Sequence, residues 1–282
     1  MTNPAKQRGD YGIENHYVIC NWTPKADVIV RQLHNESVHD KKPIIVITRN
    51  PEQVPQTTDK EYRGLLMICG DPADREILQR ADVRHAQTVI VLADETDLAN
   101  ADAKSILIAL AVDSINPNAH VVVELVKSQN KMYFEYTHVN EIVCLEQLAE
   151  KLLSQTALTP GLSQVYMDLL TQSADTNEIY QEVVPSQFVG KPYIELEQAI
   201  NANHDLDVII IGFATRVQKM KGNIAMTNGG GKAIMEQKIV INPPKDSVDS
   251  PYTKSYKLNE EDTVFLIAYE KPELSQYFNV RN

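Results

Sequence analysis

The sequence predicts an α/β protein, in which a Rossmann-like, doubly wound parallel sheet is followed by a helix–turn–helix crossover and a small α+β C-terminal lobe. In the first half, apolar runs of strand length alternate with segments of helical pattern, and each run is continuously apolar. Such runs are typical of parallel strands buried on both faces. In the second half, strands are no longer regularly spaced by helices. The six first-half runs are residues 17–20, 44–48, 65–69, 88–92, 121–126 and 141–145.

Helix-start signals lie between most of these runs. Thr23-Pro24 predicts an N-cap followed by proline at the first helical position, and Asp71-Pro72 repeats the pattern after the third run. Residues 97–115 form a long periodic segment, which predicts a third helix. This regular alternation of strands and helices indicates a doubly wound sheet.

The pattern changes after the sixth run. Residues 145–158 and 162–172 are helical in pattern, and a Thr-Pro-Gly sequence separates them. Short strands and one helix are expected after a polar segment that begins at residue 173. We therefore expect a polar N-terminal linker at 1–14, a Rossmann-like domain at 15–144, a helical dimerisation crossover at 145–175 and a C-terminal lobe at 176–282.

Composition narrows the function. The formal net charge is −11 over 282 residues, which disfavours nucleic acid and anionic membrane surfaces as partners. No apolar run approaches the ~18 residues of a membrane helix, and the polar N-terminus has no signal-peptide pattern. The three cysteines form no CxxC pair, so a reducing, cytoplasmic environment is expected. The histidine spacing does not favour a zinc site.

The turn after the first strand departs from the dinucleotide-binding fingerprint. Asn21, Thr23 and Ala26 occupy the three glycine positions. Ala26 allows close helix packing and asparagine tolerates a positive φ, but the Thr23 side chain would crowd a pyrophosphate. Arg49 follows the second strand, where an NAD protein usually places a carboxylate. Two interpretations stay open: a silent cofactor site, or a site for a nucleotide whose phosphate meets Arg49.

Candidate ligand-binding residues are those at the ends of the predicted strands, because open α/β sheets bind ligands there. Asp71 and Asp94 have a plainer alternative role as helix caps. The candidates are Asn21, Trp22, Thr23, Thr48, Arg49, Gly70, Asp71, Ala93, Asp94, Glu95 and Glu124.

The stretch "GDPADREILQRADVRHAQTVIVLADETD" (70–97) resembles the N-terminal domain of the RCK family, the regulators of potassium conductance, which includes Trk-type potassium uptake subunits. The "CNW" turn is more similar to RCK domains of ligand-gated potassium channels, whose glycine fingerprint is often degraded. Motifs similar to the family's C-terminal lobe follow in the family's order at 188–197, 207–216, 241–246 and 258–268. The resemblance covers about residues 15 to 270.

The resemblance implies a cytoplasmic gating-ring domain that is not an enzyme. It would sense a small ligand and couple it to a potassium channel pore or a transporter membrane subunit at the inner face of the membrane. The chain would be either a separately encoded subunit or a cytoplasmic fragment of a longer channel, and its polar start, which resembles a linker below a pore, favours the fragment. The ligand would be a nucleotide such as NAD, ATP, ADP or AMP, or Ca²⁺. The family's crossover packs against a neighbouring subunit, and residues 145–170 are rich in apolar side chains. We therefore expect a homodimer, with an octameric gating ring as a further step.

In calcium-activated members of the family, carboxylates near the junction of the lobes bind calcium. Asp168, Glu178 and Glu182 lie there in this sequence, and Ca²⁺ requires several oxygen ligands. A solvated acidic surface is the alternative interpretation.

Two other functional classes are the alternatives. An NAD(P)-dependent oxidoreductase would need the missing glycines and an acid–base pair, and no catalytic constellation is present; a free-standing nucleotide sensor also fits the fold. Residues 217–237 exceed the usual tight hairpin of the family. Their "GGGKA" is not a P-loop, because Met226 and Ala233 replace the first glycine and the hydroxyl residue. A hairpin tip is expected there.

Overall fold

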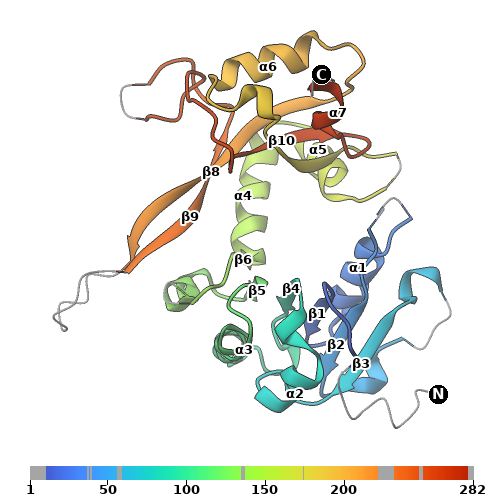
Figure 1. Ribbon diagram of the computed structural model, residues 1–282. Helices are drawn as coiled ribbons and strands as arrows, with labels where there is room; N and C mark the ends of the chain where they lie inside the picture. Colours follow the sequence, from blue (N-terminus) through green and yellow to red (C-terminus); the bar gives the residue numbers. More distant parts are fainter. Residues whose placement is uncertain are drawn as a thin grey trace. The chain divides into compact units, whose positions relative to one another are not determined.

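The chain forms two compact units, Met1–Ser163 and Gln164–Asn282. The computed structural model describes residues 11–36, 38, 40–55, 59–134, 137–173, 175–221, 232–247 and 250–278. Figure 1 shows alternating helices and strands in the first unit and a separate sheet in the second. The predicted class, a parallel α/β sheet followed by a smaller α+β lobe, is confirmed.

The first unit is built on a six-stranded parallel sheet of order β3-β2-β1-β4-β5-β6. The strand order reverses between β1 and β4, and ligands of doubly wound sheets bind at the carboxyl ends of the strands beside that point. The strands are β1 (Tyr17–Cys20), β2 (Ile44–Thr48), β3 (Leu65–Cys69), β4 (Thr88–Val91), β5 (His120–Leu125) and β6 (Glu141–Cys144).

Helices cover both faces of this sheet. On one face, Ile19 and Val46 pack with Val30 of α1 (Pro24–Leu33). On the other, residues next to these in sequence pack with α2 (Arg75–Arg80) and α3 (Ala101–Ile115). Adjacent strand residues therefore enter different cores, which explains why the strands read as continuous apolar runs.

Thr23 is the N-cap of α1 and Pro24 follows at the first helical position, as predicted, although the Thr23 side chain makes no capping hydrogen bond. Two other predictions about helix starts were wrong. Asp71 instead accepts a hydrogen bond from the Ala73 backbone in a turn, and Asp74 caps α2. The third helix begins at Ala101, because Glu95–Asp97 forms a separate 3₁₀ turn.

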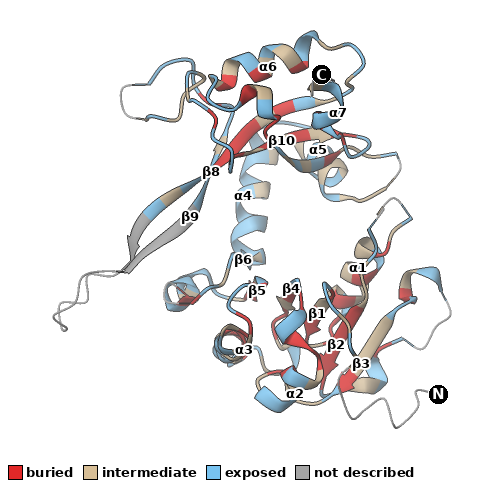
Figure 2. Cartoon of the chain, in the orientation of Figure 1, coloured by how far each residue is buried: buried red, intermediate tan, exposed pale blue. Residues whose placement is uncertain are grey.

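The crossover contains α4 (Leu145–Leu158) and α5 (Leu162–Leu170). No residue of either helix is buried. Figure 2 shows the exposed face of α4. No helix among the described residues is long and apolar enough to cross a membrane.

The second unit contains an antiparallel sheet of order β7-β10-β8-β9. Tyr193, Leu196 and Ile200 of α6 (Tyr193–Ala202) enter its core with Phe213 and Leu266 of the sheet. The expected hairpin tip lies on residues 222–231, outside the described residues. The other elements are β7 (Glu178–Val183), β8 (Ile209–Lys221), β9 (Lys232–Ile241), β10 (Thr263–Ala268) and α7 (Leu274–Phe278).

Candidate functional site

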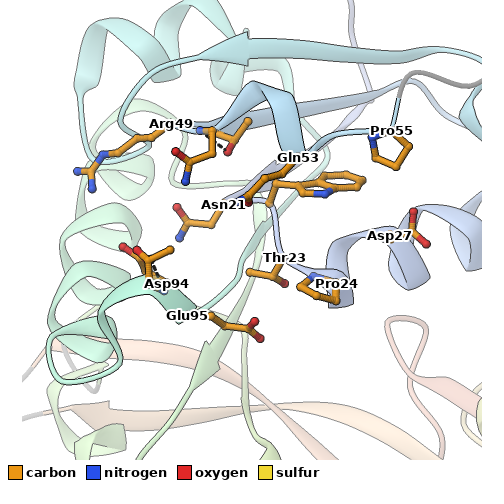
Figure 3. A pocket seen from close by; sticks show the side chains of 13 residues that line it. Asn21, Thr23, Pro24, Asp27, Arg49, Gln53, Pro55, Asp94 and Glu95 are labelled. Atoms are coloured by element: carbon orange, nitrogen blue, oxygen red, sulfur yellow. Dashed lines mark hydrogen bonds between the residues drawn. The ribbon is translucent and has the colours of Figure 1, made fainter.

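A hollow of about 800 Å³ lies at the carboxyl ends of β1, β2 and β4 in the first unit, beside the reversal of strand order. Figure 3 shows the side chains that line it. Seven had been predicted from the sequence: Asn21, Trp22, Thr23, Thr48, Arg49, Asp94 and Glu95. Six others had not: Pro24, Asp27, Asn50, Gln53, Pro55 and Thr96.

Asn21 replaces the first glycine of the fingerprint both in position and in backbone conformation. Its φ is 72°, in the left-handed region that asparagine tolerates better than most residues. Its Nδ2 donates a hydrogen bond to the Leu92 carbonyl at 2.7 Å, and its backbone N–H donates to Ile47 at 2.9 Å. The asparagine therefore ties the ends of β2 and β4 to the turn that follows β1.

Thr23 brings a buried hydroxyl to the start of α1. The residue is 5% exposed, and Oγ1 has no hydrogen-bond partner among the described residues. Buried polar groups are normally satisfied, and helix N-termini attract anions. Ala26, at the third glycine position, is fully buried in the core beneath. The turn thus keeps the close helix packing of the fingerprint and leaves one buried hydroxyl without a partner within the described structure.

Arg49 provides the positive charge at the mouth of the hollow. Its guanidinium, half exposed, pairs with Asp71. Burial opposes ionisation of Asp71, but hydrogen bonds from the Ala73 backbone and Arg49 outweigh it and lower the pKa of the carboxyl. A phosphate in the hollow would compete with an ionised Asp71 for Arg49. Partly exposed pairs of this kind are weak.

Beside the hollow, toward β5, Lys25 forms ion pairs with two glutamates, and we call this group the ion-paired bridge. Lys25 Nζ lies 2.8 Å from Glu95 Oε1 and 2.6 Å from Glu124 Oε1. The other oxygen of the buried Glu124 accepts the Ala93 backbone N–H at 3.0 Å. Desolvation opposes the charge on Lys25, but its bonds to both glutamates outweigh this and raise its pKa. Glu124 and Ala93, both predicted, therefore act beside the hollow rather than in its lining.

Asp94 caps the 3₁₀ turn Glu95–Asp97, which is the alternative role predicted for it. Its Oδ1 accepts the Thr96 backbone N–H at 3.0 Å, and its Oδ2 accepts Lys104 Nζ at 2.8 Å. Lys104 also pairs with Asp97 at 3.0 Å. Burial opposes ionisation of Asp94, but the bonds from Lys104 and Thr96 outweigh it and lower the pKa of the carboxyl.

Asp27 lies one helical turn beyond Thr23 and faces the same hollow. The Tyr62 hydroxyl donates to it, and Arg31 Nε donates at 3.1 Å. The bond from Tyr62 is the main reason that the pKa of Asp27 is lowered. Burial and the neighbouring carboxylate raise the pKa of Tyr62 to about 12. The spacing of four residues from Thr23 was the only sequence signal for Asp27.

Gly70, the remaining predicted residue, is needed for close packing. A Cβ at this position would lie 2.5 Å from Cδ1 of Ile77 in α2. Its backbone N–H donates to the Thr48 carbonyl at 3.0 Å. Gly70 therefore allows α2 to start close to the ends of β2 and β3 and does not line the hollow.

The three predicted calcium ligands have the following surroundings. Buried Glu178 accepts from Gln172 Nε2 at 3.0 Å and from the Tyr180 hydroxyl. Glu182 lies 3.4 Å from Lys271 Nζ, and Asp168 is half-buried on α5. No group of three or more His, Cys, Asp or Glu suited to a metal occurs within the described residues. Calcium binding by these carboxylates stays a prediction.

Residues 17–145 match the family model described as the TrkA-N domain, which confirms the predicted resemblance. A calcium-gated potassium channel, TvoK of Thermoplasma volcanium, is 23% identical over 167 residues, which are 58% of this chain and 46% of that protein. The probable ion channel POLLUX of Arabidopsis thaliana is 24% identical over 265 residues, 90% of this chain and 28% of that protein.

The human SLO3 gating ring has the same fold. The two structures match with a TM-score of 0.59 at 15% sequence identity, and the match covers 90% of this chain and 44% of the SLO3 chain. The chain thus spans less than half the length of these relatives.

Proposed function

We infer that this chain, whose residues 17–145 form a TrkA-N domain, is the cytoplasmic regulatory domain of a potassium channel or transporter. The hollow at the reversal of strand order carries this proposal, since a ligand there contacts the turns that follow β1, β2 and β4 together. The relatives of this chain named above are ion channels, and one of them is calcium-gated. The domain does no chemistry. Ligand binding regulates the pore by favouring one arrangement of the domain over another.

The lining supports a mononucleotide such as ADP, ATP or AMP as the ligand, rather than NAD. A phosphate group would lie between the start of α1 and Arg49, which follows β2, and a nucleoside would extend along Asn50 and Gln53. The second nucleoside of a dinucleotide would extend toward β5. That direction is occupied by the bridge between Lys25 and Glu124.

A homodimer is the proposed unit of assembly. α4 and α5 each expose apolar side chains of the kind that interfaces cover, and so does the outer face of the second unit's sheet. These residues are Leu148, Leu153, Leu158, Val165, Tyr166, Met167 and Leu170 on the helices, and Ile179, Val183, Ile209, Ile239 and Ile241 on the sheet. Burying them reciprocally in a two-fold dimer would give an obligate-type interface, upward of ~2,000 Å². Such dimers would then build an octameric gating ring against the pore.

Isothermal titration calorimetry with ATP, ADP, AMP and NAD tests the ligand. We expect saturable binding of at least one mononucleotide and weaker binding of NAD. Arg49→Gln should weaken the mononucleotide about tenfold, because a charge-assisted hydrogen bond to phosphate is lost. Arg216→Gln is the matched control, since Arg216 is an exposed arginine paired with Glu261 outside the hollow. No binding of any nucleotide, or equal loss in both variants, would contradict the proposal.

Calcium is the second proposed ligand, supported by the name of the calcium-gated relative. Asp168, Glu178 and Glu182 would supply oxygens after Glu178 exchanged its present donors for the ion. Thermal unfolding with and without calcium tests this, because a ligand of the folded state raises the melting temperature. A shift that Glu178→Gln abolishes would support the site, and an unchanged wild-type melting temperature would eliminate it.

A further inference from the structure

A second hollow, of about 350 Å³, lies at the amino ends of β2 and β3, and the first hollow lies at the opposite end of β2. Its lining contains four lysine or arginine side chains, one histidine and one carboxylate, although the whole chain has a net charge of −11. The lining residues are His34, Glu36, Lys41, Lys42, Pro43, Lys60, Arg63 and Gly64.

His34 makes hydrogen bonds to two of the segments that form this hollow, the one before β2 and the one before β3. It follows α1 and is 4% exposed. Its Nδ1 lies 2.6 Å from the Glu61 carbonyl oxygen, and its Nε2 lies 2.7 Å from that of Lys42. A carbonyl oxygen only accepts hydrogen bonds, so both ring nitrogens must donate. Only the imidazolium form of histidine has two N–H donors. The geometry therefore places a positive charge at the base of the hollow.

The neighbouring basic side chains are differently engaged. Lys42 Nζ is held by Gln87 Oε1 at 2.5 Å and by Asp40 at 3.3 Å. Lys60 pairs with Glu36 at 3.0 Å, but both side chains are largely exposed, and such pairs contribute little. The exposed Arg63 guanidinium has no hydrogen-bond or ion-pair partner within the described part of the chain. Arg63 and Lys60 are therefore available to a ligand at little energetic cost.

We propose that this second hollow binds a small tetrahedral oxyanion of the phosphate class, held by Arg63, Lys41 and Lys60 above the His34 imidazolium. Arginine and lysine are the usual phosphate ligands, and the hollow is at the small end of the size range of ligand pockets. The charged groups around the imidazole are Glu36, Lys41, Lys42, Lys60, Glu61 and Arg63.

Calorimetric titration of the full chain with sodium sulfate at constant ionic strength tests the site, because sulfate keeps its charge across the neutral pH range. We expect saturable binding. Arg63→Gln should weaken it at least about tenfold, and Arg49→Gln, in the first hollow, should leave it unchanged. No saturable binding, or loss in the Arg49 variant instead, would overturn the proposal.

Two further measurements complete the test, and the first needs no variant. Nitrogen-15 NMR at about pH 6 should show both His34 ring nitrogens protonated, and a single protonated nitrogen would overturn the imidazolium assignment. Cosedimentation with phosphatidylcholine vesicles, with and without phosphatidic acid, identifies the source of the anion. Retention by phosphatidic acid that Arg63→Gln abolishes would assign a lipid headgroup, and sulfate binding without retention would assign a soluble anion.

Discussion

Substitution of Asn21 tests the turn on which the candidate site depends. The residue has a φ of 72° and donates to Leu92 at 2.7 Å. Asn21→Ala removes that hydrogen bond, a loss of about 1 kcal/mol, and forces an alanine into the left-handed region, at a cost of about 1–2 kcal/mol. Asn21→Gly removes the same bond without the steric cost. Glycine should therefore be about 1 kcal/mol more stable than alanine here, the reverse of their order in a helix or strand.

Urea unfolding followed by tryptophan fluorescence measures this difference. The only tryptophan, Trp22, is buried beside Asn21, so the signal reports on the first unit alone. We expect stability to fall in the order wild type, Asn21→Gly, Asn21→Ala. If the alanine variant equals or exceeds the glycine variant in stability, residue 21 is not left-handed and the account of the turn is refuted.

Three further predictions concern the crossover, the ion-paired bridge and pH. Val165→Asp, on the exposed apolar surface of α5, should convert a dimer into a folded monomer in sedimentation. A variant that stays dimeric would show that α5 is not part of the interface. Glu124→Ala should destabilise the first unit by about 1–3 kcal/mol, since Lys25 and the Ala93 N–H lose their acceptor; unchanged urea unfolding would show that the bridge is unimportant. The pKa of Asp27 is lowered chiefly by the hydrogen bond from Tyr62. The ionised Asp27 carboxylate therefore stabilises the folded state at pH values above the pKa of an unfolded aspartate, and this contribution is lost as the pH falls below about 4. Tyr62→Phe should therefore reduce the loss of stability between about pH 5 and pH 3, and an identical loss in both proteins would argue against the bond.

The strand pattern allowed much of the first unit to be predicted. The continuous apolar runs at Ile44–Thr48 and Leu65–Cys69 indicated burial on both faces, which the two cores on either side of the sheet explain. Polar residues that end such strands must lie at one edge of the sheet, so Asn21, Thr48, Arg49 and Asp94 could be placed together.

Long-range pairings could not be predicted in this way. Lys25 and Glu124 are 99 positions apart, and their ion pair depends on β4 and β5 being neighbours in register. The bond between Tyr62 and Asp27 depends on where a 3₁₀ turn meets α1. Neither relation leaves a periodic signal in the sequence.

The side-chain partners at helix starts could not be predicted for a different reason. A Thr-Pro or Asp-Pro pair predicts a capping position, but the partner of the side chain depends on the local turn. Asp71 bonds to Ala73 and leaves the cap to Asp74, three residues later. Thr23 occupies the cap and leaves its hydroxyl unbonded within the described structure. The second hollow was missed because its basic residues come from the loop before β2 and the turn before β3.

We propose that a ligand in the first hollow changes the surface through which the domain assembles. Hydrogen–deuterium exchange of the full chain, with and without saturating ADP, tests this claim most directly. The account predicts slower exchange in residues 21–27 and 48–53, together with a change in residues 145–170 of the crossover. Slower exchange confined to the hollow, with the crossover unchanged, would show binding without regulation and would contradict the account.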